Sequence, residues 1–227
     1  MRAVLVPAYN EEKNIREVVT RLKKIPDLRI IVVDDGSKDK TSQVAKKMKV
    51  DLVRHKTNKG KAEAIKTGFS YIFDKYPQIK YIGLIDSDMQ YLPEEINRVF
   101  LPLEKNEADI VTGYRNWSKV PFRHRLGNFV WRTAFNILFG TRFRDTNIGY
   151  MALNTKSAKL MRNKIYGGYI LENSMFIEAI RKGMRIKQIP VTVLYKRKSE
   201  IKRGIRVVAG VLLFILREGL KYRFGIK

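Results

Sequence analysis

The sequence predicts an α/β fold in which a mostly parallel β-sheet is covered by helices on both faces. Three observations support this class. The first half of the chain alternates short apolar runs with segments of helical periodicity. The runs are apolar almost throughout, as expected for strands that are buried on both faces of a parallel sheet. The segments between them are roughly 10–15 residues long, the length of the helices that connect parallel strands.

The predicted elements of the first half follow one another regularly. Apolar runs predict strands over residues 3–10, 29–36, 51–55, 81–86 and 108–114. Helices are predicted between them over residues 11–24, 40–49 and 61–76. In the first of these helices, Ile15, Val18 and Leu22 recur at the spacing of one helix face. Another helix begins near Pro93, because proline is favoured in the first turn of a helix.

The second half is less regular. Helices are predicted over residues 122–139, 156–161 and 172–182, and strands over residues 147–153 and 185–195. The C-terminal segment is helical in composition, and its uncharged stretch 207–216 is about 15 Å long as a helix. That is about half the hydrocarbon thickness of a bilayer, so we expect no membrane-spanning helix. The stretch is expected either to dock on a membrane or to pack within the protein or a dimer.

Charge divides the chain into two unequal halves. The net charge is +24, yet residues 1–113 hold 21 Lys/Arg against 17 Asp/Glu, whereas residues 114–227 hold 25 against 5. Such asymmetry indicates an anionic partner for the second half, either nucleic acid, an anionic membrane surface or a phosphorylated substrate. The chain has no cysteine, which excludes disulfides and thiolate metal sites and fits a reducing compartment. The N-terminal segment does not have the pattern of a secretory signal.

Polar side chains follow three of the predicted strands. The segments are PAYNE (7–11), DDGS (34–37) and DSDMQ (86–90). Ligands bind at the carboxyl ends of parallel strands, so these three segments are expected to meet at one crevice. Asp86, Asp88 and Gln90 offer only oxygen ligands, as Mg²⁺ or Mn²⁺ prefers. A single D-x-D pair also occurs as a turn cap, but three polar strand ends together favour a metal-bridged diphosphate. The chain has no glycine-rich phosphate loop of the dinucleotide-binding or P-loop type.

Four segments in this order and spacing, PAYNE, VDDGSKDKT, NKGKAEAIKTG and LIDSDMQ, resemble family 2 glycosyltransferases with the GT-A fold. The resemblance implies metal-dependent, inverting transfer from a nucleotide-diphosphate sugar of the GDP-mannose or UDP-glucose type. It places the nucleotide sugar against Pro7, Tyr9, Glu11, Asp35, Lys59, Asp86 and Ser87, with Arg197 and Lys202 on the diphosphate. It assigns catalytic roles to Asp88, Arg197 and Glu172, and the metal to Asp86, Asp88 and Gln90.

Three later segments resemble polyprenyl-phosphate sugar transferases such as dolichyl-phosphate mannose synthase. They are GYRN (113–116), RLGN (125–128) and DTNIGYM (145–151). The resemblance implies that Arg115, Arg125 and Asp145 form the site for the phosphate of a polyprenyl or dolichyl phosphate. The chain departs from these relatives at Met151, Ser174 and Glu200, where arginine, an acid and lysine are expected. A peripheral location on the cytoplasmic face of the cell membrane follows from this acceptor.

A saccharide or polysaccharide acceptor is the alternative. It would need a general base, for which Glu172 and Asp145 are the candidates, whereas a lipid phosphate is already ionised. A basic nucleic-acid-binding protein is a remote alternative, because the chain lacks a recognisable nucleic-acid module and such a protein has no use for acidic strand ends. We therefore expect no nucleic-acid partner.

These expectations divide the chain into three parts. Residues 1–113 are predicted to be the nucleotide-sugar-binding half of a GT-A domain, residues 114–200 its acceptor-binding half, and residues 201–227 a membrane-associated amphipathic helix. In the predicted helix 122–139, aromatic and basic residues interleave, which suits an interfacial helix, although some of the rings are expected to belong to a core. His55 and His124 are expected to be structural or surface residues away from the crevice.

Overall fold

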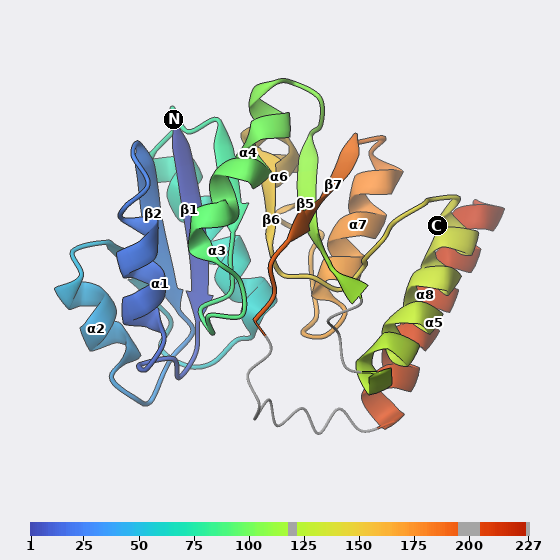
Figure 1. Ribbon diagram of the computed structural model, residues 1–227, viewed down its shortest axis with the longest axis horizontal. Coiled ribbons are helices and arrows are strands. Elements are labelled where there is room, and N and C mark those ends of the chain that lie inside the picture. The colour runs from blue at the N-terminus through green and yellow to red at the C-terminus, as the bar shows by residue number, and fades with distance from the viewer. Residues whose placement is uncertain (118–121, 195–204, 226–227) are drawn as a thin grey trace.

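A seven-stranded sheet in the order β3-β2-β1-β4-β6-β5-β7 runs through the computed structural model (Figure 1). The structure describes residues 1–117, 122–194 and 205–225. The strands are β1 (Arg2–Ala8), β2 (Leu28–Asp34), β3 (Asp51–Arg54), β4 (Tyr81–Leu84), β5 (Ile110–Arg115), β6 (Met151–Asn154) and β7 (Ile186–Val191). Only β6 runs antiparallel to its neighbours, β4 and β5. The predicted α/β fold with a mostly parallel sheet is therefore confirmed.

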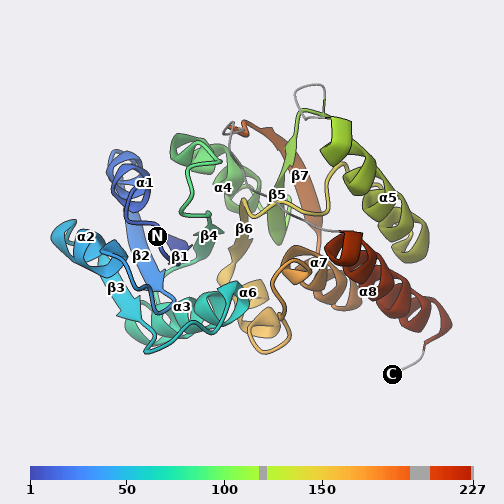
Figure 2. The ribbon, with the colours of Figure 1, turned by 90° about the horizontal axis from the view of Figure 1, so that it is seen from below.

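Helices cover both faces of this sheet (Figure 2). They are α1 (Ile15–Leu22), α2 (Thr41–Lys47), α3 (Lys61–Lys75), η1 (Pro93–Glu95), α4 (Ile96–Glu104), α5 (Phe122–Phe139), α6 (Thr155–Met161), α7 (Leu171–Arg181) and α8 (Ile205–Phe224). Side chains alternate along the strands, so Val4 and Val6 pack beneath α1 and α4 whereas Leu5 packs beneath α3. Each face of the sheet thus has its own apolar core.

Several predicted boundaries differ from the structure in ways that concern the cleft. The helix predicted from Glu11 begins at Ile15, because the Glu11 amide donates to Thr41 Oγ1 (2.8 Å) and fixes a turn there. The strand predicted over residues 147–153 begins only at Met151, so residues 147–150 form a loop. The strand predicted to run to residue 195 ends at Val191, and residues 195–204 lie outside the described part.

Helices α5 and α8 lie side by side at the end of the molecule beyond β7 (Figures 1 and 2). The Trp131 indole donates to the Val208 carbonyl (3.0 Å), and Gly219 lies directly against Leu138. Trp131 and Phe135 are buried against α7 and α8. These two rings therefore belong to a core, as the sequence analysis expected for some of the rings of this helix. Phe129 is 56% exposed and lies outside that core.

One side of helix α8 packs within the protein, which is one of the alternatives that its sequence allowed. Val211, Phe214 and Ile215 are buried, whereas Leu213 and Leu220 are exposed on the outer side. None of the helices in the described ranges combines the length and apolarity that crossing a membrane requires.

The α5–α7–α8 core yields a stability prediction. Phe135 has no exposed surface, and its ring centroid lies 4.5 Å from that of Phe139 and 6.2 Å from that of Phe176. We expect Phe135→Ala to lower the free energy of unfolding by about 3–5 kcal/mol, measured by urea denaturation. The control Ile137→Ala alters a side chain on the same helix that is 64% exposed, and it should change stability by less than about 0.5 kcal/mol. Similar small effects of both variants would contradict the packing of α5.

Candidate active site

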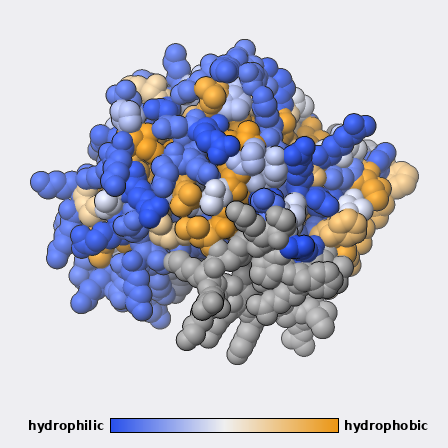
Figure 3. Space-filling view, viewed as in Figure 1, coloured by the Kyte–Doolittle hydropathy of each residue, from blue (hydrophilic) through white to orange (hydrophobic). Residues whose placement is uncertain are grey.

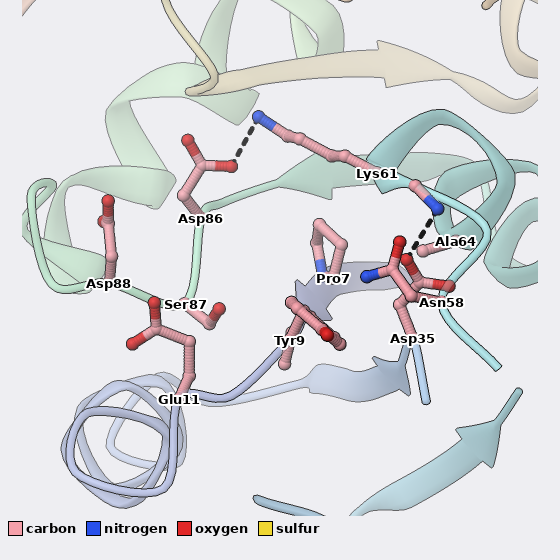
Figure 4. A pocket seen from close by; sticks show the side chains of 12 residues that line it. Pro7, Tyr9, Glu11, Asp35, Asn58, Lys61, Ala64, Asp86, Ser87 and Asp88 are labelled. Carbon is pink, nitrogen blue, oxygen red and sulfur yellow. Dashed lines mark hydrogen bonds and ion pairs between the residues drawn. The ribbon is translucent and has the colours of Figure 1, made fainter. Parts of the chain in front are cut away.

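The ends of β1, β2 and β4 share one cleft of about 310 Å³. It is lined by Pro7, Ala8, Tyr9, Glu11, Asp35, Asn58, Gly60, Lys61, Ala64, Asp86, Ser87 and Asp88. Figure 4 shows Glu11, Ser87 and Asp88 on one side of the cleft, and Asp35 and Asn58 on the other. The structure therefore brings together the three polar segments that the sequence places at strand ends.

The two aspartates of the DDGS turn have different environments. Asp34 has no exposed surface, and its carboxylate accepts from the Ser37 amide (2.8 Å) and from the Ser42 hydroxyl, which shapes the turn into α2. Asp35 lines the cleft but is only 3% exposed. Gly36 has φ +72°, and a Cβ there would lie 2.5 Å from the backbone of Thr57, so only glycine fits this turn.

Asp35 organises the neighbouring NKGK loop. Its carboxylate accepts from the amides of Lys59 (2.9 Å) and Gly60 (2.7 Å). The imidazole of His55 lies 2.7 Å from Asp35 Oδ1 and 2.9 Å from Thr67 Oγ1. With three partners on it, the Asp35 carboxylate holds the loop that forms one wall of the cleft.

The expectation that His55 lies away from the crevice is wrong. His55 follows the last residue of β3, so it too stands at a strand end, where it is buried behind Asp35. It is structural, as expected, but it supports a cleft residue. The side chain of His124 lies outside the described residues.

A lysine lies between two carboxylates at the centre of the molecule. Lys61 Nζ is 2.6 Å from Asp86 Oδ1 (Figure 4) and 3.1 Å from Glu172 Oε1. Burial alone would lower the pKa of Lys61, but the two carboxylates raise it well above its ordinary value. Burial raises the pKa of Asp86, and Asp88 adds to that rise while Lys61 opposes it. The contact joins α3, the end of β4 and the first turn of α7, so it connects the two halves of the chain.

The loop before β6 closes over this contact. At Gly149 a Cβ would lie 2.3 Å from Asp86 Oδ2 and 2.8 Å from Lys61 Nζ, so any side chain there would displace this ion pair. The Gly149 amide donates to the Tyr91 hydroxyl (3.3 Å). The contacts of Gly149 thus lie within residues 147–150, which form a loop and not the predicted strand.

The acidic strand end fits a cation that is shared with a substrate. Asp88 lines the cleft and accepts from the Gln90 amide (3.0 Å), whereas Gln90 itself is not part of the lining. In the described part of the chain, no three His, Cys, Asp or Glu side chains converge on one point. Mg²⁺ is commonly bound by one or two carboxylates together with substrate phosphates, so Asp86 and Asp88 suit this mode. Asp86 would have to share or release Lys61 to bind such an ion.

Two of the residues expected at the acceptor phosphate meet next to the Gly149 loop: Arg115 at the end of β5 and Asp145 in the segment between α5 and β6. Arg115 Nε donates to Asp145 Oδ2 (2.6 Å), and the same guanidinium donates to the Asn147 carbonyl. Asp145 has no exposed surface, so it fixes Arg115 rather than reaching a ligand itself. Arg125 is exposed on α5.

Some assigned residues lie elsewhere, and some lining residues were missed. The Lys59 side chain is not part of the lining, and Arg197 and Lys202 lie outside the described residues. Asn58 and Lys61 line the cleft although sequence reasoning did not select them. Both belong to the NKGK segment, whose position next to the donor was the signal that could have identified them.

Comparisons with known proteins agree with this geometry. Residues 3–167 match the family described as Glycosyl transferase family 2. The UDP-N-acetylglucosamine–dolichyl-phosphate N-acetylglucosaminyltransferase of Methanococcus voltae is 27% identical, over 93% of this chain and 92% of that protein. The dolichol-phosphate mannosyltransferase of Pyrococcus furiosus is 30% identical, over 95% of this chain and 62% of that protein. Glucosyl-3-phosphoglycerate synthase from Mycobacterium tuberculosis, crystallised with Mn²⁺, UDP and glucosyl-3-phosphoglycerate, has a similar structure (TM-score 0.77, 20% identity, 100% of this chain and 81% of that one).

The Lys61 contact yields a second stability prediction. Lys61→Met leaves the carboxylates of Asp86 and Glu172 without their shared cation. We expect the free energy of unfolding, measured in urea without divalent ions, to fall by about 1.5–3 kcal/mol, the range for hydrogen bonds to charged groups.

The matched control is Lys66→Met on the same helix. Lys66 pairs with Glu63 (2.7 Å) at the surface, so we expect a loss of no more than about 0.5 kcal/mol. Equal losses in the two variants would show that Lys61 contributes no more than a surface ion pair.

Proposed function

The chain belongs to glycosyl transferase family 2, and we propose that it transfers a sugar from a nucleotide-diphosphate sugar to a polyprenyl phosphate such as dolichyl phosphate. The observation that carries the donor side is the single cleft formed by three strand ends, with Asp86 and Asp88 at its edge. The acceptors in the names of the M. voltae and P. furiosus relatives support the acceptor class.

The donor nucleotide is proposed to lie between the ends of β1 and β2. Pro7 and Tyr9 lie at the centre of the cleft, and Tyr9 is 42% exposed, so its ring is available to a ligand (Figure 4). Glu11 and Asp35 flank it on either side. Because the Asp35 carboxylate already accepts three hydrogen bonds, we propose that it contributes chiefly by shaping the Lys59–Gly60 turn.

Asp86, Asp88 and Gln90 are proposed to hold Mg²⁺ or Mn²⁺ against the donor diphosphate. When bound, the cation supplies a Lewis acid that neutralises charge on the departing diphosphate. Arg197, with Lys202, is proposed to act on the same diphosphate. Ser87, between the two aspartates, lines the cleft and is proposed as a further donor contact.

The pairing of the two candidate bases in the second half, Glu172 and Asp145, with basic side chains favours a phosphate acceptor over a saccharide. A saccharide hydroxyl needs a general base, but Glu172 is paired with Lys61 and Asp145 is fully buried against Arg115. A phosphate monoester is ionised near neutral pH and needs no base. Its oxygen attacks the anomeric carbon from the face opposite the diphosphate, the bond from that carbon to the diphosphate breaks, and the configuration inverts. Arg115 and Arg125 are proposed to bind the phosphate.

A membrane surface is the proposed second partner. Figure 3 shows apolar and hydrophilic residues close together at the end of the molecule formed by α5 and α8. The exposed apolar side chains there include Phe129, Ile137, Leu213, Leu220 and Phe224. Apolar side chains beside arginines suit a helix pair that lies in the headgroup region and is attracted to anionic lipid. We propose peripheral attachment through this face, on the cytoplasmic side.

The metal assignment predicts a loss of activity. Asp88→Ala should reduce sugar transfer on the order of 10²–10³-fold, because charge on the leaving group is no longer balanced. Asp86→Ala should also abolish the thermal stabilisation by UDP or GDP that depends on Mn²⁺ or Mg²⁺. The control Asp74→Ala, exposed on α3, should retain activity. Full turnover with excess EDTA, or an undiminished metal-dependent shift in both cleft variants, would refute the assignment.

The acceptor assignment predicts a selective transfer. Incubation with radiolabelled UDP- and GDP-sugars should label a polyprenyl phosphate but not the corresponding polyprenol, because the attacking oxygen belongs to the phosphate. Transfer to oligosaccharides at an equal or higher rate would favour the saccharide alternative and would leave the donor site intact.

A further inference from the structure

Arginine and aromatic side chains alternate in a stack at the end of β5. The Arg115 guanidinium lies 5.4 Å from the Trp117 ring centroid, and Arg132 of α5 lies 5.7 Å from the same ring. Arg132 is also 5.6 Å from the ring of Phe129. Cation–π contacts of this kind hold planar guanidinium groups in fixed orientations.

A third arginine, Arg144, lies beside the stack in the loop that follows α5. Arg144 lies 4.9 Å from the Tyr114 ring and donates to the hydroxyl of that residue (2.7 Å). The Arg144 carbonyl accepts from Trp117 Nε1 (3.0 Å) and from Arg132 (3.2 Å). The Arg132 side chain therefore contacts the backbone of Arg144, while the Arg144 guanidinium is held on the neighbouring ring of Tyr114.

The three arginines differ in the charges around them. Arg115 is paired with the buried carboxylate of Asp145. Arg132 and Arg144 contact no carboxylate among the residues that the structure describes; their polar partners are a carbonyl and a tyrosine hydroxyl. Both therefore keep a positive charge that an anion can neutralise, and a guanidinium fork suits the oxygens of a phosphate.

The position of the pair fits an acceptor. Arg144 is five residues before Gly149, which touches Asp86 and Lys61 at the donor cleft, so at most about 18 Å of chain separates them. On its other side the stack ends at Phe129, which is part of the exposed apolar surface of α5. A ligand with a phosphate at one end and an apolar chain at the other can therefore place the phosphate on the arginines and the chain along α5.

We propose that Arg132 and Arg144 form a phosphate-binding site for the acceptor, in addition to the expected residues Arg115 and Arg125. Arg125, Phe129 and Arg132 are spaced by four and three residues and so share one face of α5. The inference rests on the proposed function for the identity of the acceptor, whereas the anion site itself rests on the geometry.

The test measures ligand affinity by calorimetry in the full-length chain. The probes are geranyl phosphate, geraniol and inorganic phosphate, with UDP or GDP plus Mn²⁺ as the donor-site control. Arg132→Gln and Arg144→Gln should each weaken geranyl phosphate binding by about tenfold or more, since each removes charge-assisted hydrogen bonds. Nucleotide binding should not change, and geraniol should bind weakly to every variant. Arg132→Lys and Arg144→Lys, which keep the charge but lose the fork, should be intermediate.

Arg142→Gln is the matched control. It removes an exposed charge from the same loop, two residues from Arg144, without touching the stack, so it should change the affinity by less than about twofold. An equal loss in this variant, or affinities of Arg132→Gln and Arg144→Gln within twofold of the unaltered chain, would overturn the site.

Two outcomes separate this inference from the proposed function. Unchanged affinity in the variants of a chain that transfers sugar to polyprenyl phosphate refutes the arginine site alone. Binding of inorganic phosphate that both substitutions abolish, without binding of or transfer to geranyl phosphate, supports the anion site and refutes the lipid acceptor. If the unaltered chain binds neither phosphate, both are refuted.

Discussion

The repulsion between carboxylates at the end of β4 is the constraint around which this structure is arranged. Asp86 and Asp88 are two residues apart, and Glu172 approaches from α7. The ammonium group of Lys61 lies 2.6 Å from Asp86 and 3.1 Å from Glu172, so it compensates two of these charges at once. Because Lys61 begins α3 and Glu172 lies in the first turn of α7, the contact also fixes how α7 of the second half of the chain sits against α3 of the first. The ammonium group of Lys61 therefore neutralises carboxylate charge, as a bound cation does in a metal site.

The antiparallel strand β6 begins directly after the loop that passes these charges. The chain must leave α5, pass Asp86 closely and then enter the sheet between β4 and β5. The loop that does so brings Asp145 against Arg115 and Gly149 against Asp86. One short segment therefore both holds Arg115 and covers the ion pair between Asp86 and Lys61.

Sequence reasoning reached the sheet and the three strand ends because both follow from local patterns. Apolar runs, helical spacing and the position of DDGS and DSDMQ after strands do not depend on distant residues. It did not identify Lys61, since a lysine at the start of a helix becomes important here only through distant partners, Asp86 and Glu172, the latter 111 positions later. The role of His55 was missed for the same reason, because its partner Asp35 lies 20 residues earlier. The strand predicted from residue 147 was too long because the local apolar pattern carries no information about distant contacts such as that of Gly149 with Asp86.

The uneven charge of the two halves has a physical role in the proposed reaction. A phosphate acceptor and a nucleotide diphosphate are both anions, and the carboxylates of the cleft add further negative charge beside the donor. Two unit charges 4 Å apart at an effective dielectric constant of 20 interact by about 4 kcal/mol, so bringing the substrates together is costly without compensation. The first half supplies little excess positive charge, because it has 21 basic and 17 acidic residues. The second half has 25 basic and 5 acidic residues, so most of the compensating positive charge can come from there. The excess cations of the second half thus belong to the same electrostatic problem as the acids of the first: they lower the energy of an anion that must attack next to another.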